Sequence, residues 1–357
     1  MHLENMINER GLPPLPGNIR SKEDFIREKP NIRHILEEYA YGVMPDAPEN
    51  MHVTVTEEVR RFCAAHAILR FLSCRIRMNG QDFSFPFFEA IPLGRKEKLP
   101  AFVYMHFYKE TSDLYLPMEE ITDRGYAVFG FCYKDVTSDD NDFTTGIAKY
   151  LGRDRRTNEN APGKIAMWAW AAMRVMDYVM TKDEIDKDRV AVMGHSRLGK
   201  TALLAGAYDE RFRYVISNGS GCMGAALLRG TTGENYEAIV RNFPFWFCPR
   251  FCAMAPDAEK LPFDQHFLMS LSVPRHLLVG SAEDDAWADP TGEFLTLYKT
   301  NDVYRLFSMK GLVTDDRLPS VPSVWNDGEA SYHIRTGMHF LSRGDWNVYM
   351  DYMDTHR

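Results

Sequence analysis

The sequence lacks the marks of several protein classes. It has no C-x-x-C pair and no H-E-x-x-H motif, so a zinc site is not expected. It has 42 Lys and Arg against 50 Asp and Glu, a net charge of −8, which leaves no basic excess to neutralise a phosphate backbone. We therefore expect no metal, no other cofactor and no nucleic-acid partner.

Long apolar runs are also missing. The longest helical apolar stretch, residues 165–173, ends at Arg174 and Asp177 and is too short to span a bilayer, so no membrane partner is expected. The N-terminus has no apolar segment of the kind that a secretory signal carries. As given, the chain is expected in the cytoplasm, or in the periplasm or outside the cell if a native signal was removed. The sequence does not fix the oligomeric state.

The composition is that of an ordinary globular chain, with 45% hydrophobic and 26% charged residues among 357. No internal repeat, low-complexity tract or linker marks a boundary, which predicts one domain over residues 1–357. Residues 1–50 are polar and contain prolines, with one helical stretch around residues 31–41. We expect this segment to wrap around the body of the domain.

Two kinds of strand pattern follow. Residues 53–92 contain several β-rich runs whose spacing indicates antiparallel strands at the edge of a sheet. Beyond them, short continuous apolar runs are typical of strands buried on both faces, at residues 101–105, 127–131, 190–193, 214–217 and 276–279. Helical patterns such as residues 163–180 separate these runs. The pattern predicts a three-layer α-β-α sandwich with a mostly parallel central sheet and antiparallel N-terminal edge strands.

The sharpest local signal is the sequence G-H-S-R-L-G at residues 194–199. An apolar run precedes it and a helical pattern follows, so Ser196 is predicted on a sharp strand-to-helix turn, the nucleophile elbow of α/β-hydrolases. Gly194 fits the usual G-x-S-x-G pattern. Leu198 stands where the second Gly is expected, and Gly199 follows it, so the pattern is only partly met.

Two other interpretations of this motif remain open. Ser196 could cap a structural helix. Residues 194–201 also match G-x-x-x-x-G-K-T, a phosphate-binding loop. That loop normally follows the first strand of a nucleotide domain, whereas this motif lies past the middle of the chain.

An acid and a base should follow the nucleophile in this fold. The apolar run that begins at residue 276 ends in an acidic loop, where Asp285 and Asp284 compete for the role of the acid that orients an imidazole. A merely solvated acidic loop is the alternative. His339 follows the strand predicted at residues 331–335 and fits the general base, with His333 inside that strand as its rival.

With these motifs, the chain resembles the bacterial branch of the glucuronoyl esterases, carbohydrate esterase family 15. The resemblance covers roughly residues 95–355 and is carried by the motifs around residues 194–203, 205–212, 216–227, 243–248, 261–266 and 287–290. It implies a metal-free serine mechanism that cleaves esters between glucuronic acid side groups of xylan and lignin alcohols.

The resemblance also implies roles for individual residues. Ser196 would be the nucleophile and His339 the base, and Arg197 would support the oxyanion with its backbone N–H and its guanidinium. The alternative for Arg197 is a surface salt bridge. Lys200, Glu234 and Trp287 would contact the sugar, although Trp287 could instead pack in the core.

Two departures from the family pattern matter, and a third loop has two interpretations. Gly219 stands where many members carry the triad Glu, so the resemblance implies that Asp285 supplies the acid. The loop of residues 105–110 has no Gly, which leaves the second oxyanion donor open. The acidic loop of residues 135–142 is expected to be solvated, with a metal site as the weaker alternative.

We therefore predict a serine carboxylesterase that hydrolyses esters of (4-O-methyl-)glucuronic acid side groups of glucuronoxylan with lignin-type alcohols, through an acyl-enzyme. The alternative enzyme is an acetyl xylan esterase or carbohydrate deacetylase. Two other classes are a non-catalytic carbohydrate-binding relative of the fold and a P-loop nucleotide binder.

Overall fold

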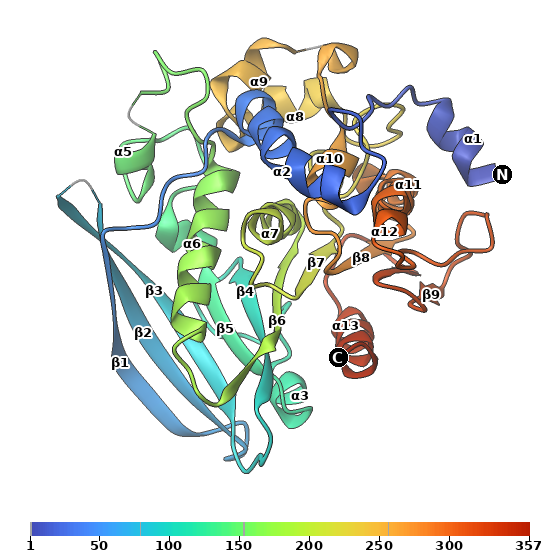
Figure 1. The fold of residues 1–357 in the computed structure, drawn as a ribbon. Coiled ribbons are helices and arrows are strands. Elements are labelled where there is room, and N and C mark those ends of the chain that lie inside the picture. The colour runs from blue at the N-terminus through green and yellow to red at the C-terminus, as the bar shows by residue number, and fades with distance from the viewer. Residues whose placement is uncertain (1, 79, 153, 256) are drawn as a thin grey trace.

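The computed structural model describes residues 2–78, 80–152, 154–255 and 257–357, in which ten strands form one sheet (Figure 1). The strand order is β1-β2-β3-β5-β4-β6-β7-β8-β10-β9. The strands from β5 to β10 in this order pair in parallel, and antiparallel strands lie at both edges. The predicted α/β-hydrolase sandwich with a mostly parallel sheet is confirmed.

The N-terminal edge of the sheet is made of long antiparallel strands. They are β1 (Asn50–Phe62), β2 (Ala67–Met78) and β3 (Gln81–Pro92). In Figure 1 these strands extend to the lower left of the helical layers. The third of them joins the parallel part by pairing with β5 (Ala127–Cys132), so these strands are the edge that the sequence predicted.

The parallel centre also follows the predicted apolar runs. Its other strands are β4 (Leu99–His106), β6 (Ile185–His195), β7 (Tyr214–Asn218), β8 (His276–Ala282) and β10 (Ala330–Arg335). The sequence did not predict β9 (Ser323–Trp325), an antiparallel strand at the far edge. Three residues are too few to show a periodic pattern.

Alternate residues of the buried strands enter two separate cores. In β4, Val103 and Met105 face one core, and Phe102 and Tyr104 face the other. The first core is covered by α6 (Lys164–Val179), α7 (Arg197–Tyr208), α10 (Gln265–Ser270) and α11 (Pro290–Lys299), the second by α3 (Met118–Asp123) and α13 (Arg343–Thr355). Both faces of these strands are apolar because both are covered.

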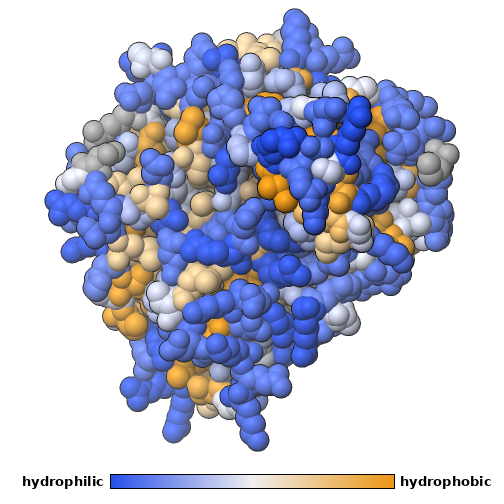
Figure 2. All heavy atoms as spheres, in the orientation of Figure 1, coloured by the Kyte–Doolittle hydropathy of each residue, from blue (hydrophilic) through white to orange (hydrophobic). Residues whose placement is uncertain are grey.

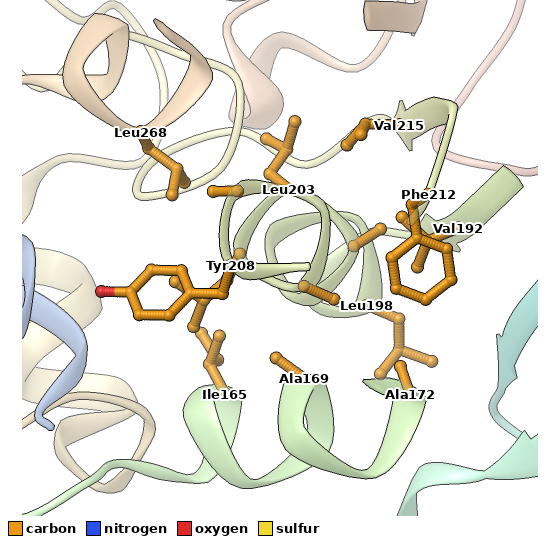
Figure 3. Close-up of a cluster of buried hydrophobic side chains, with 14 of the residues drawn as sticks. Ile165, Ala169, Ala172, Val192, Leu198, Leu203, Tyr208, Phe212, Val215 and Leu268 are labelled. Carbon is orange, nitrogen blue, oxygen red and sulfur yellow. The ribbon is translucent and has the colours of Figure 1, made fainter. Parts of the chain in front are cut away.

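Helix α7 lies inside the first core. Figure 3 shows Leu203 and Leu198 of this helix among side chains of α6, α10 and the strands β6 and β7. Ile165 and Ala169 approach it from α6. Since α7 directly follows Ser196, this packing fixes the direction in which the chain leaves β6.

The helices of the N-terminal segment differ from the prediction. Helix α1 (His2–Asn8) was not expected, and α2 (Lys22–Leu36) begins well before residue 31, with the π-helix η1 (Glu37–Tyr41) after it. Ser21 and Asp24 form a capping box that starts α2. Pro30 lies inside this helix, and because proline disfavours a helix interior it obscures the pattern before it.

The other helices are short and connect the layers. They are α4 (Tyr133–Val136), α5 (Ala148–Leu151), α8 (Tyr236–Asn242), α9 (Pro249–Ala253), α12 (Asn301–Leu306) and the 3₁₀ turns η2 (Pro244–Trp246), η3 (Ala258–Lys260) and η4 (Ala286–Ala288). Within the described residues, no helix is long and apolar enough to cross a bilayer. Figure 2 shows that polar side chains cover most of one face of the molecule, with apolar atoms in small separate groups.

Candidate active site

Ser196 lies on the turn between β6 and α7. Its backbone has φ 58° and ψ −129°, a conformation that is strained for a residue with a side chain. A Cβ at Gly194 would lie 2.0 Å from the carbonyl oxygen of Leu198, and a Cβ at Gly199 would lie 2.9 Å from Ser217 Oγ. The crowding therefore falls on residues 194 and 199. Leu198 can replace the second glycine of the usual pattern because its own side chain packs into the core.

The same geometry excludes a phosphate-binding loop at residues 194–201. In such a loop the helix starts at the G-K-T end, whereas α7 already begins at Arg197. The Lys200 ammonium, in a residue only 3% exposed, donates to the Ser220 carbonyl oxygen at 2.7 Å and to that of Cys222. The protein's own carbonyls thus occupy the place that a phosphate would need.

The predicted acid and base lie in contact. His339 Nδ1 is 2.5 Å from Asp285 Oδ2, at a carboxylate that is almost fully buried. Two backbone hydrogen bonds join their loops, from Glu283 N to the Arg335 carbonyl at 2.9 Å and from Asp284 N to that of Gly337 at 3.0 Å. The Asp284 side chain is exposed. Of the two candidate acids, only Asp285 can therefore orient the imidazole.

Gly219 lies beside this pair. It has φ +51°, and a Cβ built on it would be 3.3 Å from Asp285 Oδ2 and 3.4 Å from His339 Nδ1. Ser196 N donates to the Asn218 carbonyl at 2.8 Å, so the nucleophile turn adjoins the same place. Residue 219, where the resemblance would place a triad Glu, thus faces the His339–Asp285 pair.

Two other histidines take different places. The His195 ring contacts that of His339 with centroids 4.5 Å apart and planes tilted by 32°, and its Nδ1 lies 2.7 Å from Asn218 Oδ1. Burial lowers the pKa of His195 to about 3, so this ring stays neutral beside the base. His333, the rival base, is buried, with its Nε2 2.7 Å from Asp345 Oδ1, and belongs to the interior.

The expectation of a solvated loop at residues 135–142 is wrong for Asp139. Its side chain is 7% exposed and accepts hydrogen bonds from Arg197 Nη1, from Tyr133 Oη at 2.8 Å and from Trp246 Nε1 at 2.7 Å. The Arg197 guanidinium also lies over the Trp246 ring, 5.1 Å from its centroid. Asp139 thus fixes the side chain of Arg197, the residue after the nucleophile. The sequence did not predict this role, because the partners of Asp139 are distant in sequence.

The three residues predicted to contact sugar lie close together. Lys200 Nζ is 3.4 Å from Glu234 Oε2, and Glu234 N donates to the Trp287 carbonyl at 2.8 Å. Trp287 is 57% exposed, which rules out core packing for its ring. The Lys200 and Glu234 side chains are only 4% and 6% exposed, so the Trp287 indole is the open stacking face of this group and the ion pair lies beneath the surface.

Aromatic side chains gather where the loop after β4 meets the loop of His339. We call Tyr108, Tyr115 and Phe340 the aromatic cluster; Tyr115 lies 4.9 Å from the Phe340 ring and 6.2 Å from that of Tyr108, between centroids. Phe340 is 40% exposed, and the neighbouring Met338 is 74% exposed. This cluster was not predicted, although two apolar residues flank His339 in the chain.

We find no candidate metal centre in the part of the chain that the structure describes. No three of its His, Cys, Asp or Glu side chains are grouped so that they could hold a metal ion. The six cysteines are free thiols.

Glu293 of α11 is a further buried carboxylate behind the site. Its Oε1 accepts hydrogen bonds from Ser220 N at 2.7 Å and Gly221 N at 2.9 Å, and Ser281 Oγ donates to its Oε2 at 2.5 Å. Burial raises the pKa of Glu293 to about 7, despite these hydrogen bonds. The group thus braces the backbone next to Gly219 and titrates near neutral pH.

We expect Glu293→Gln to stabilise the protein more as the pH rises. The unfolded carboxyl has an ordinary pKa, so the folded state favours the protonated form, and its ionisation destabilises the fold between about pH 4.5 and 7. The full effect is at most about 3 kcal/mol. Melting temperatures of both proteins should agree near pH 5, and the variant should melt several degrees higher at pH 8. A constant difference across this range would contradict the titration of Glu293.

Known proteins resemble this chain over most of its length. A family model described as "Glucuronyl esterase, fungi" matches residues 74–308. "Carbohydrate esterase MZ0003" from an unknown prokaryotic organism is 43% identical over 241 residues, which cover 67% of this chain and 55% of that protein. The chain spans little more than half the length of this relative and of a further curated one.

Solved structures agree with this comparison. A promiscuous CE15 esterase from a marine bacterial metagenome is 31% identical with a TM-score of 0.85, covering 96% of this chain and 94% of that one. The glucuronoyl esterase from Solibacter usitatus is 27% identical with a TM-score of 0.87, covering 96% and 97%. With the family model matching well over half of its residues, the chain belongs to the glucuronoyl esterase family, carbohydrate esterase family 15.

Proposed function

We propose that the protein hydrolyses esters in which glucuronic acid side groups of glucuronoxylan, with or without the 4-O-methyl group, are joined to lignin-type alcohols. Curated relatives of this chain are named 4-O-methyl-glucuronoyl methylesterases. The observation that carries the proposal is the difference between the two flanks of Ser196. The residues proposed to contact the sugar, Glu234 and Trp287, lie on one side of Ser196, and the aromatic cluster lies on the other.

The strand order explains this division. The loop after β4, with Tyr108 and Tyr115, follows a strand on one side of β6, and Phe340 joins it from the loop after β10 through its contact with Tyr115. Glu234 and Trp287 follow β7 and β8 on its other side. An ester of a uronic acid needs a sugar site for its acyl part and a separate site for its alcohol. An acetyl ester of xylan needs room only for a methyl group on the acyl side, so the arrangement favours the uronate ester.

The chemistry then follows from the geometry. Asp285 holds the Nδ1–H of His339, so the Nε2 lone pair accepts the proton of Ser196 as its Oγ attacks the ester carbonyl. The start of α7 offers the Arg197 backbone N–H, and the guanidinium held by Asp139 adds positive charge near the developing oxyanion.

Collapse of this intermediate gives the acyl-enzyme. His339 protonates the leaving alcohol as the bond between carbonyl carbon and alkoxy oxygen breaks, and the uronoyl group stays on Ser196. The same imidazole then takes a proton from water, which attacks the acyl group and releases the uronic acid. The substrate of the first step and the water of the second thus approach His339 from the same side.

The role of Asp285 is tested by three amide variants on one ester. Asp285→Asn should lower kcat by about 10³ to 10⁴, because an amide favours the wrong imidazole tautomer. Asp284→Asn is the matched control and should stay within about 3-fold, since its side chain is exposed. Glu234→Gln should act through substrate binding. A loss below about 10-fold at Asp285, or a deeper one at Asp284, would contradict this assignment of the acid.

The sugar site is tested with two substrates. Trp287→Ala and Glu234→Gln should lower kcat/KM for methyl glucuronate by about 10- to 100-fold, because contacts to the ring act only when the ring is present. The same variants should keep 4-nitrophenyl acetate hydrolysis within about 3-fold of the parent. Ser196→Ala, which should lose both activities, is the reference for complete loss. Equal losses on the two esters would assign these residues a structural role.

The alcohol site is tested by changing only the alcohol. Phe340→Ala should lower kcat/KM for benzyl glucuronate about 10-fold more than for methyl glucuronate, the equivalent of about 1.4 kcal/mol of lost aromatic contact. Ile26→Ala, an exposed apolar residue on α2, is the control and should leave both rates unchanged. An equal effect of Phe340→Ala on both esters would exclude the aromatic cluster as the alcohol site.

A further inference from the structure

The loop that carries His339 has little packing of its own. Residues 336, 338, 339 and 340 are all exposed, and only Gly337 is partly covered. A segment without buried side chains gains little free energy from apolar contacts. Its conformation must therefore depend on polar contacts of its backbone.

Arg335 makes three of those contacts from the end of β10, beside the bond from Asp284 N to the Gly337 carbonyl. Its Nη1 donates to the Thr336 carbonyl at 2.9 Å, and its Nη2 donates to the Met338 carbonyl at 3.1 Å and to that of Phe340. One guanidinium thus bonds the carbonyls immediately before and after His339. The planar, forked donor set of arginine is suited to several acceptors at once, whereas a lysine ammonium acts as a single point.

The guanidinium is itself held from the interior. Its Nε donates to Asp345 Oδ2 at 3.0 Å, and Ser342 N and Oγ each donate to the same oxygen at 2.7 Å. His333 Nε2 lies 2.7 Å from the other carboxylate oxygen. Burial alone would raise the pKa of Asp345, but the hydrogen bonds from His333 and Ser342 outweigh it and hold the pKa well below its usual range. These hydrogen bonds therefore favour the charged carboxylate, which is the form that Arg335 needs as a partner.

We propose that Arg335 is a positioning residue for catalysis, which holds the His339 loop by its backbone carbonyls so that the imidazole faces both Asp285 and Ser196, with Asp345 holding Arg335 in turn. The proposal rests on the role of His339 as the base, stated above. The Asp285–His339 hydrogen bond joins side chains of two exposed loops, so a small movement of residues 336–340 would misalign it. A displacement of about 1 Å at such a site can cost about 100-fold in rate.

The experiment compares Arg335→Ala and Arg335→Lys with Arg124→Ala, using methyl glucuronate and 4-nitrophenyl acetate. Arg124 is a matched control, because its side chain is 25% exposed against 21% for Arg335 and it too bonds carboxylates and lies near a backbone carbonyl, away from the site. We expect Arg335→Ala to lower kcat about 10- to 100-fold on both esters with KM within about 3-fold. Arg335→Lys should recover only part of this loss.

A chemical rescue separates positioning from general stability. Added guanidinium at millimolar concentration should restore kcat several-fold in Arg335→Ala, and should not raise it in Arg335→Lys or Arg124→Ala. Melting temperatures of the two alanine variants should fall by similar amounts. A kcat of Arg335→Ala close to that of Arg124→Ala, or no rescue in a variant that melts like the control, would overturn the proposal. If Arg335→Ala does not fold, a parental kcat in Arg335→Lys would overturn it.

The failure of the proposed substrate would look different. In that case the unmodified protein would hydrolyse 4-nitrophenyl acetate but not methyl glucuronate, and the Arg335 variants would still be judged on the acetyl ester. A protein inactive on both esters, with His339→Ala no different from the parent, would overturn both proposals together.

Discussion

The site depends on the register of three parallel strands at their carboxyl ends. Ser196 N donates to the Asn218 carbonyl and Gly219 N donates to that of Gly280, each at 2.8 Å, so that β6, β7 and β8 end side by side. The nucleophile turn and the loop of Asp285 leave from these ends. A slip of one residue would turn the side chains of a strand to its opposite face. The two cores prevent such a slip, because the side chains on both faces of these strands are apolar and pack closely against the covering helices.

Three buried carboxylates hold groups next to the site in fixed positions. Asp139, Glu293 and Asp345 are each nearly inaccessible, and each accepts at least three hydrogen bonds. They hold respectively the Arg197 guanidinium, the backbone beside Gly219 and the Arg335 guanidinium. Burying a charge costs several kcal/mol unless it is paired, so their partners are fixed in number and direction. Trp287 and His339 stay about half exposed, whereas Lys200 and Glu234 are buried like these carboxylates.

The sequence predicted the parts of the molecule whose signal is local. Continuous apolar runs located the buried strands, and the glycines around Ser196 located the turn, because each feature lies within a few residues. Asp139 could not be found in this way, since it lies 58 residues from Arg197 and 107 from Trp246. Arg335 was missed for a different reason. It adjoins the loop it holds, but only the folded backbone turns the carbonyls of that loop toward it.

The pairing of Gly219 with Asp285 follows from the space available around His339. A Cβ at residue 219 would already lie 3.3 Å from the Asp285 carboxylate, so a longer acidic side chain there would meet that group. A second carboxylate brought into contact with Asp285 would raise the pKa of one of the two groups, because like charges at short range disfavour the ionised form. The imidazole Nδ1 carries a single hydrogen and needs one acceptor. An acid at residue 219 and the acid at residue 285 would therefore compete for the same imidazole hydrogen. In this chain the positive φ of residue 219 further favours glycine there, which leaves the role to Asp285.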